Sequence, residues 1–220
     1  MSQNLRVDIV SDVVCPWCII GYKQVEAALA IFDPPLDVEF YWHPFELNPA
    51  MGVEGQDISE HIAEKYGSTA EQSRANRQSL SDIGDSLGFA FSWADGKRIY
   101  NTLKAHMLLA ATGRELGWQK QTDLKLALFK AYFQDDRDVG DEAVLLDVAA
   151  SVGLDHEAAA AWLADEALAR QVRGEENYWR GENINGVPAI IFDQKFLVPG
   201  AQSADTFASV IGKVLEQRAA

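Results

Sequence analysis

The stretch that most constrains the fold of this chain is Cys15-Pro-Trp-Cys18, which holds both cysteines of the sequence. An apolar, strand-like run at residues 5–10 precedes it, and a helical pattern follows it. A Cys-x-x-Cys motif between a strand and a helix is typical of a thiol–disulfide centre. We therefore expect the chain to fold around a strand-to-helix junction that presents these two sulfurs.

The position of Cys15 at the start of a helix favours a reactive thiolate. Pro16 suits the first helical position, because its φ is preset and it lacks an N–H group that would have no partner there. The free N–H groups of the first turn and the positive end of the helix dipole stabilise a negative sulfur. Cys18 follows on the same helix face, so the two sulfurs can close a disulfide. We expect Cys18 to be the more buried, resolving thiol.

Two other interpretations of the cysteine pair stay open. Both thiols could be structural, since free cysteine packs in cores as a small apolar side chain. A zinc site would need two further ligands, but His43, His61 and His106 are scattered and there is no second Cys-x-x-Cys motif. The redox interpretation is favoured over both.

The composition indicates which classes of partner to exclude and which cellular compartment to expect. The 220 residues carry a net charge of −14, which argues against binding to nucleic acid or to an anionic membrane. No run approaches the ~20 apolar residues of a membrane span, and the chain does not open with a basic segment and an apolar core. We therefore expect a cytoplasmic protein. Because cytosolic thiols are normally reduced, a cysteine pair there points to catalysis rather than to a structural disulfide.

The first half of the chain predicts a parallel βαβ unit. Strand patterns at residues 5–11 and 36–42 are joined by a helix that begins at Pro16. An almost purely helical stretch follows. Within it we expect a capping box at Ser68-Thr69-Ala70-Glu71 and a strong helix over residues 97–116.

Strand character returns near the end of the chain, at residues 187–193 and 196–198, before a helix at 203–217. The order predicts an α/β protein with a thioredoxin fold, in which a large all-α domain is inserted between the two halves. A separate α/β domain beside a helical bundle is less favoured, because the last segment has no βαβ unit of its own to join. The expected thioredoxin-like domain is 1–56 with 182–220, and the expected helical domain is 57–181.

Val187-Pro188 is the second candidate element of the site. A proline that opens a strand cannot donate to the strand ladder, so it belongs at a strand start or an edge. Its place after an upstream Cys-x-x-Cys and before a ββα segment is where thioredoxin folds carry a cis-proline loop that faces the cysteines. The Cys-x-x-Cys motif and the late Val187-Pro188 together indicate a thioredoxin fold more specifically than either does alone.

The chain resembles the DsbA family of thioredoxin-fold oxidoreductases, and within it the cytoplasmic FrnE-like branch. The resemblance implies an inserted helical domain, Cys15 as the nucleophile and Val187-Pro188 as the substrate-facing cis-proline loop. It spans nearly the whole chain and rests on five stretches: residues 11–18, residues 42–49, Asn101-Thr102 with Ala105-His106, residues 185–188, and residues 198–202.

Kappa-class glutathione transferases and 2-hydroxychromene-2-carboxylate isomerases have related folds. These relatives typically carry serine at the position that matches Cys15 and lack the second cysteine. The presence of Cys15 and Cys18 therefore favours disulfide chemistry in this chain. Glutathione remains open as a partner thiol.

Several other residues are candidates for substrate binding. Trp17 and Phe45 are expected to form an apolar rim, with burial in the core as the alternative. His106, about one helical turn after Asn101, is expected either to line the site or to pack structurally. Gln202 joins the candidates through its place in the resembling stretch. Asp12 is expected to raise the thiol pKa of Cys15 by its charge or to accept a proton, with an exposed loop carboxylate as the alternative. The role of His43 stays open between tuning of Cys15 and structural packing.

The function expected from these features is thiol–disulfide exchange. Cys15 attacks or is attacked at a sulfur, a mixed disulfide forms, and Cys18 resolves it. No metal or nucleotide cofactor is expected. The expected partner is a disulfide- or thiol-containing protein or a small thiol such as glutathione, and a homodimer remains open. One alternative is a glutathione-dependent transferase or isomerase that acts on a small aromatic molecule. The other is a redox-switched binding or chaperone module.

Overall fold

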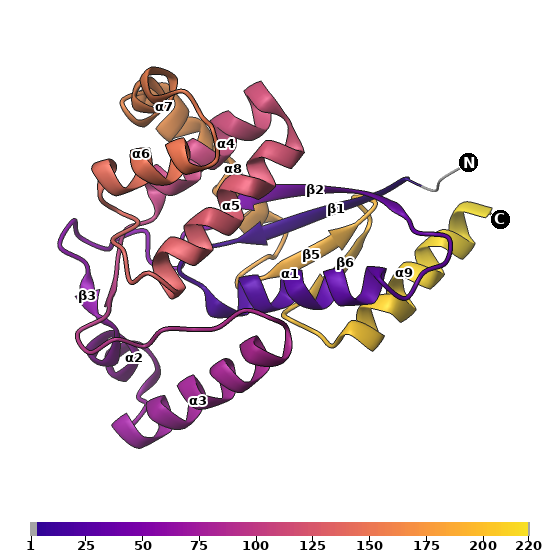
Figure 1. Cartoon of the computed structure of the whole chain (residues 1–220), viewed down its shortest axis with the longest axis horizontal. Helices are drawn as coiled ribbons and strands as arrows, with labels where there is room; N and C mark the ends of the chain where they lie inside the picture. Colours follow the sequence, from indigo (N-terminus) through magenta and orange to yellow (C-terminus); the bar gives the residue numbers. More distant parts are fainter. Residues whose placement is uncertain (1–3, 220) are drawn as a thin grey trace.

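The computed structural model describes residues 4–219; residues 1–3, where we expected no export leader, and residue 220 lie outside the described part. Its centre is a four-stranded sheet with the order β2-β1-β5-β6 (Figure 1). The strands are β1 (Asn4–Ser11), β2 (Asp37–Pro44), β5 (Ala189–Phe192) and β6 (Phe196–Pro199).

The pairing of these strands confirms the predicted thioredoxin fold. β1 and β2 run parallel and are joined by helix α1 (Pro16–Leu29). β5 is antiparallel to β1, and β6 is antiparallel to β5. The predicted order βαβ and then ββα is therefore one sheet, built from the two ends of the chain.

The core of the sheet follows from the apolar residues of β1. Leu5, Val7 and Ile9 are fully buried. Helices α1 and α9 (Ala204–Ala219) contact each other and lie along one face of the sheet (Figure 1). Phe192 of β5 and Phe207 of α9 pack with their ring centres 6.1 Å apart. This packing attaches α9 to the sheet, and α1 with the cysteines packs against α9.

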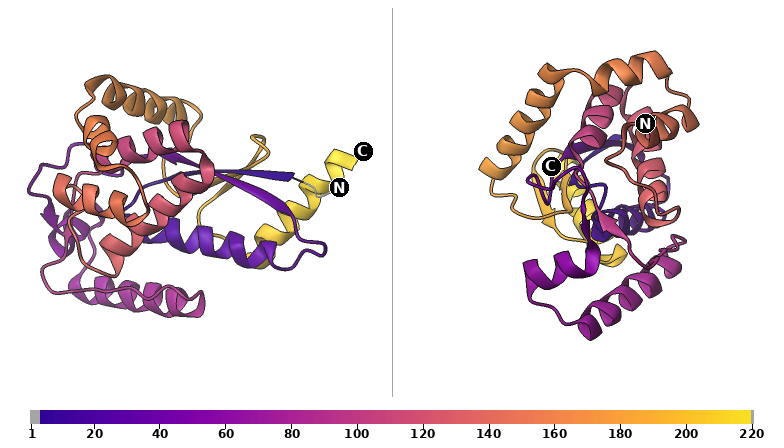
Figure 2. Two further views of the ribbon diagram at one scale, coloured as in Figure 1. Left: turned by 45° about the horizontal axis from the view of Figure 1, so that its top comes forward. Right: turned by 90° about the vertical axis from the view of Figure 1, so that its left-hand side faces the viewer.

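A helical block connects the two halves of the sheet. Figures 1 and 2 show α2 and α3 on one side of the N-terminal end of α1 and the remaining helices of the block on the other side. None of the helices between residues 4 and 219 combines the length and apolar composition that a bilayer-spanning segment needs. The block consists of α2 (Ile58–Tyr66), α3 (Ala70–Ser86), α4 (Leu103–Leu116), α5 (Trp118–Phe133), α6 (Glu142–Ser151), α7 (His156–Leu163) and α8 (Glu166–Gly181).

Two local predictions in this block are wrong in detail. The capping box lies one residue later than expected: the N-cap is Thr69, whose hydroxyl accepts the Gln72 N–H at 3.2 Å, while Gln72 Oε1 accepts the Thr69 N–H at 2.9 Å. Both registers have the spacing of a capping box, so sequence alone did not separate them.

The helix expected over residues 97–116 begins at Leu103 instead. Asn101 Oδ1 accepts the Leu103 N–H at 3.0 Å and satisfies a free donor of the first turn. The residues before it form the short strand β4 (Arg98–Ile99), which pairs with β3 (Gln56–Asp57). Strands of two residues are too short for alternation to reveal them.

Gln121 of α5 protects the exposed edge of the sheet. Its side-chain oxygen accepts the Trp42 N–H at 3.0 Å, and its side-chain nitrogen donates to the Trp42 carbonyl at 2.9 Å. The amide thus replaces one residue of a neighbouring strand. This contact attaches the helical block to β2, whose free edge would otherwise carry unpaired backbone groups.

We predict that Gln121→Ala destabilises the protein by at least about 2 kcal/mol, because two buried backbone groups lose partners worth about 1–3 kcal/mol each. Gln119→Ala, at an exposed position of the same helix, is the matched control and should change stability by less than about 0.5 kcal/mol. Urea unfolding of both variants measures the difference. Equal stabilities would contradict the role given to the Gln121 amide.

Candidate active site

The turn from β1 into α1 places Cys15 in the lining of the site. Cys15 is the N-cap of α1 and Pro16 follows in the first turn, which confirms the predicted helix start. The Cys15 side chain makes no capping hydrogen bond to the first turn. Its thiol instead donates to the Val187 carbonyl oxygen, with Sγ 3.6 Å from that oxygen. The sulfur is therefore directed at the loop on the far side of the turn.

Cys18 lies one turn deeper and is completely buried, whereas Cys15 keeps 4% of its surface exposed. Both carry free thiols, and the Cys18 N–H donates to the Cys15 carbonyl at 3.1 Å. Burial raises the pKa of the Cys18 thiol well above its ordinary value, and the interaction with Cys15 raises it further, while Lys125 opposes the shift. Cys18 is thus held as a neutral thiol behind Cys15.

The loop that faces Cys15 contains a cis peptide bond between Val187 and Pro188. The Gly200 N–H donates to the Pro188 carbonyl at 2.8 Å. On the other side, a Cβ atom at Gly21 would come within 3.1 Å of the Pro188 ring. A glycine on α1 therefore allows the proline to sit directly against the cysteine-bearing helix.

A cleft of about 560 Å³ opens in front of Cys15. Its walls are the β1–α1 turn, the loop at Val187, and helices α2 and α3. The lining is largely apolar, with basic groups from His61, Lys65 and Arg77. The apolar lining residues are Val14, Pro16, Trp17, Leu47, Ile58, Ile62, Tyr66, Leu80, Trp93, Ile99, Phe133 and Val187. This cleft can accept a substrate that offers a sulfur to Cys15 together with apolar and acidic groups.

The turn that leads to Cys15 contains a buried carboxylate, that of Asp12. Asp12 is 1% exposed, and its Oδ2 accepts the Leu47 N–H at 2.8 Å. His106 is equally buried, and its Nε2 lies 3.5 Å from Asp12 Oδ1, close enough for charge pairing but at the limit of a hydrogen bond. Burial alone would raise the pKa of Asp12, but His106, the Leu47 N–H and Lys125 outweigh it and lower the pKa. Asp12 is therefore an ionised group inside the protein.

The structure separates the expected substrate-binding residues into two groups. Trp17, 43% exposed, and Val187 line the cleft beside Cys15. Pro188 is buried directly behind Val187. His106 lies beside the buried Asp12 and does not line the cleft.

Phe45, Asn101 and Gln202 are not brought to the cleft. Phe45 is buried in a cluster against which Val187 packs, so it supports the loop from behind. The Asn101 side chain donates to the Met51 carbonyl and caps α4, and the exposed Gln202 donates to the Pro199 carbonyl. These three side chains stabilise local structure around the site.

Lys125 of α5 is a residue of the site that we did not predict from the sequence. Its side chain is fully buried. A signal was present in the sequence, because Lys125 interrupts the apolar stripe formed by Leu124, Leu128 and Tyr132 at helical spacing. Asp12 and both cysteines act on its charge.

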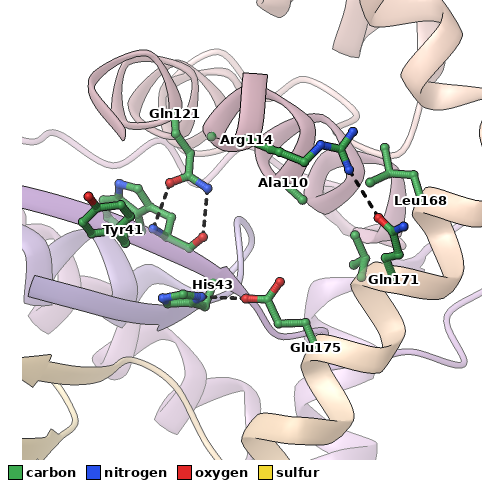
Figure 3. A pocket seen from close by; sticks show the side chains of 11 residues that line it. Tyr41, His43, Ala110, Arg114, Gln121, Leu168, Gln171 and Glu175 are labelled. Carbon is green, nitrogen blue, oxygen red and sulfur yellow. Dashed lines mark hydrogen bonds and ion pairs between the residues drawn. The ribbon is translucent and has the colours of Figure 1, made fainter. Parts of the chain in front are cut away.

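A second pocket, of about 320 Å³, lies between β2 and helices α4 and α8 (Figure 3). It contains no cysteine. His43 Nδ1 lies 2.6 Å from Glu175 Oε1 of α8, and its Nε2 lies 2.8 Å from Asp8 Oδ1 of β1. His43 therefore joins the helical block to the sheet and does not reach Cys15. Across residues 4–219, this cluster included, no three His, Cys, Asp or Glu side chains converge as metal ligands would.

Comparison with known proteins identifies the family. A model of the DSBA-like thioredoxin domain matches residues 6–212. The chain belongs to this family. The crystal structure of a probable DsbA oxidoreductase, SCO1869 from Streptomyces coelicolor, is 31% identical, with a TM-score of 0.88 over 96% of this chain and 90% of that one.

Two more distant structures share the fold. A 2-hydroxychromene-2-carboxylate isomerase is 14% identical, with a TM-score of 0.69 over 97% of this chain and 98% of its own. The cytosolic disulfide reductase DsbM from Pseudomonas aeruginosa, solved with GSH, is 15% identical, with a TM-score of 0.65 over 96% of this chain and 99% of its own. The DsbA-like chain thus shares one architecture with redox enzymes and with an isomerase.

The His43 contacts predict a pH-dependent contribution to stability. Burial alone would lower the pKa of His43, but its interactions with Asp8 and Glu175 outweigh it and raise the pKa above the ordinary 6.5. The pKa of His43 is higher in the folded protein than in the unfolded chain. The stabilisation that these contacts give the folded protein is therefore complete below about pH 6.5, and it is lost as the pH rises through the His43 pKa of the folded state.

We predict that His43→Gln destabilises the protein by about 2 kcal/mol near pH 6, the worth of hydrogen bonds between charged groups. The difference in the free energy of unfolding between wild type and variant should become smaller as the pH is raised. Urea unfolding across pH 6 to about 9 measures it, with the exposed His156→Gln as the control. A gap that stays constant or widens with pH would contradict the ion-pair role of His43.

Proposed function

We propose that this DsbA-like protein is a thiol–disulfide oxidoreductase that cycles Cys15 and Cys18 between a dithiol and a disulfide. The observation that carries the proposal is the placement of Cys15. Its sulfur lies at the floor of a cleft, 3.6 Å from the Val187 carbonyl of the cis-proline loop, with the buried Cys18 one helical turn behind it.

The reaction proceeds through a mixed disulfide. The Cys15 thiolate attacks one sulfur of the partner disulfide, and the other partner sulfur leaves as a thiolate. Cys18 then attacks Cys15, the bond between Cys15 and the partner breaks, and the partner is released with two reduced sulfurs. In the opposite direction, the Cys15–Cys18 disulfide oxidises a partner dithiol through the same intermediate. The proposal covers oxidation, reduction and isomerisation because all of them use this intermediate.

The cleft favours a partner that combines sulfur with acidic and apolar groups. Lys65 and Arg77 line it, and Trp17 forms an exposed apolar surface beside Cys15. Glutathione, with two carboxylates and one thiol, fits this chemistry, and the likeness in fold to a cytosolic reductase solved with GSH supports it. We propose a thiol exchange partner of this kind in the cytoplasm, and the mechanism requires no metal or nucleotide.

A glutathione-dependent isomerase or transferase is the second candidate. The likeness in fold to 2-hydroxychromene-2-carboxylate isomerase and the apolar cleft favour it. In that mechanism Cys15 would position glutathione without forming a disulfide, and Cys18 would take no part. The requirement for Cys18 therefore separates the two candidates.

We predict that Cys15→Ser reduces the rate of disulfide reduction to the uncatalysed rate, because no nucleophile remains at the cleft floor. Cys18→Ser should stop after one turnover and leave the partner bound covalently to Cys15. Turnover of a small aromatic disulfide, with mass spectrometry of the protein, measures both effects. Ser209→Ala, at an exposed position of α9, is the control.

Two outcomes would decide against the proposal. Unchanged turnover by a folded Cys15→Ser variant would show that another group carries the reaction. Full multiple turnover by Cys18→Ser, combined with loss in Cys15→Ser, would show that the reaction needs no resolving thiol and would contradict the proposed Cys15–Cys18 cycle.

A further inference from the structure

Arg180, near the C-terminal end of α8, makes two contacts with the loop that follows β2. Its guanidinium carbon lies 4.1 Å from the ring centre of Phe45, and its Nη2 donates to the Glu46 carbonyl at 2.9 Å. A planar guanidinium can stack on an aromatic face while its N–H groups donate to acceptors at its edge. Arg180 therefore attaches the helical block to this loop through one aromatic ring and one backbone group.

The Phe45 ring in turn supports the cis-proline loop. Phe45 is 2% exposed and belongs to a buried apolar cluster that includes Ile184 and Ala189. These two residues lie on either side of Val187-Pro188 in the sequence, and the Val187 side chain packs against the cluster. The Ile184 N–H also donates to the Trp179 carbonyl at 3.1 Å, which attaches the start of the loop to α8. The position of Val187 therefore depends on the Phe45 ring and on the end of α8.

The Val187 carbonyl interacts differently with the two redox states of Cys15. In the dithiol, the Cys15 thiol donates to this carbonyl, with Sγ 3.6 Å from the oxygen. In a disulfide between Cys15 and Cys18, the Cys15 sulfur carries no hydrogen, so this bond cannot form. A hydrogen bond that exists in only one of two states stabilises that state, and a typical net contribution changes an equilibrium constant a few-fold. The place of the Val187 carbonyl thus influences the equilibrium between dithiol and disulfide.

We propose that Arg180 is a positioning residue that holds the Val187 carbonyl at the Cys15 thiol and so favours the dithiol over the disulfide; this rests on the proposed oxidoreductase function. The guanidinium keeps the Phe45 ring in place, and the cluster around that ring fixes Val187. In exchange with oxidised glutathione, the two protein thiols lose two electrons and two protons and form one S–S bond, while the glutathione disulfide is reduced to two thiols. Loss of the Arg180 contacts shifts this exchange toward the protein disulfide.

Arg180 also carries a positive charge close to two buried carboxyl groups. Burial raises the pKa of Glu46 to about 7 and also raises the pKa of Glu176, and the charge of Arg180 opposes both shifts. The Glu46 N–H donates to Glu176 Oε1 at 2.8 Å, so both groups belong to the same contact between the loop and α8. A test of the proposal therefore has to separate the stacking of the guanidinium from its charge.

The equilibrium constant with a glutathione redox buffer measures the effect, at about pH 6, where an ordinary thiol is protonated. Arg180→Met should change the constant by about 3-fold in favour of the Cys15–Cys18 disulfide, as expected for the loss of one modest hydrogen bond. Arg170→Met, at an exposed arginine of the same helix, is the matched control and should leave the constant unchanged. A merely structural role would destabilise both redox forms alike. Equal constants in Arg180→Met and in the control would overturn the proposal.

A charge-preserving variant separates stacking from charge. Arg180→Lys keeps the positive charge but presents no planar group to the Phe45 ring, so it should retain most of the shift seen in Arg180→Met. A shift in Arg180→Lys of less than half that in Arg180→Met would assign the effect to charge and overturn the positioning role.

A double-mutant cycle tests whether Arg180 acts through the Phe45 ring. Phe45→Leu keeps an apolar side chain but removes the aromatic face, so it should shift the equilibrium constant in the same direction as Arg180→Met. The double variant should shift the constant no further than the larger of the two single variants, because both remove the same contact. Shifts that add would show that Arg180 acts independently of the ring and would overturn the proposal.

A measurement on the wild type keeps the proposal testable even if no variant folds. Loss of a hydrogen bond at a carbonyl oxygen moves the carbon-13 signal of that carbonyl upfield. The Val187 signal should therefore move upfield when Cys15 and Cys18 are oxidised. Val198, another valine that precedes a proline, lies in β6 paired with Ile190 and is the internal control. A Val187 signal that moves no more than that of Val198 would overturn the proposal.

Failure of the proposed function gives a different result. In that case the wild type in the redox buffer would carry glutathione on Cys15 and form no bond between Cys15 and Cys18. Failure of the Arg180 role alone leaves a reversible Cys15–Cys18 disulfide whose equilibrium constant is the same in Arg180→Met and in the control.

Discussion

The buried carboxylate of Asp12 holds together the parts from which the site is built. Its Oδ2 binds the Leu47 N–H of the loop after β2, and its backbone carbonyl accepts the Cys15 N–H at 3.3 Å. An ionised carboxylate inside a protein is stable only if donors and cations surround it. His106 of α4, with Nε2 3.5 Å from Asp12 Oδ1, and Lys125 of α5 both lower the pKa of Asp12. The redox turn, the sheet and the helical block are thus coupled through one charge.

The sheet and the helical block contribute different parts of the site. The thioredoxin-like half provides the cysteines and the Val187-Pro188 loop. The helical block provides the far wall of the cleft, through α2 and α3, and the buried groups behind Cys18, through α4 and α5. Figure 2 shows these two sets of helices on opposite sides of the cysteine-bearing end of the sheet. The block therefore does more than cover the site, because it sets the electrostatic environment of the inner thiol.

The sequence was sufficient for the features that arise from local patterns. The strands of the central sheet, the helix that follows Cys15 and the proline just before β5 are each encoded within a few residues. The start of α4 was not predicted, because it depends on an asparagine cap and on a two-residue strand pairing with a distant segment. Lys125 was missed because its importance comes from what the fold places around it. Phe45 and Gln202 lie within resembling stretches, yet in the structure Phe45 packs in a buried cluster and the Gln202 side chain binds the Pro199 carbonyl.

The equilibrium between the dithiol and the disulfide of Cys15 and Cys18 tests the central claim most directly. The protein would be equilibrated in buffers of reduced and oxidised glutathione and its thiol state determined by mass spectrometry after rapid alkylation. The account predicts a single reversible two-electron transition to an intramolecular Cys15–Cys18 disulfide, with the glutathione adduct on Cys15 only a minor species. A stable glutathione adduct on Cys15 in place of the intramolecular disulfide would contradict it.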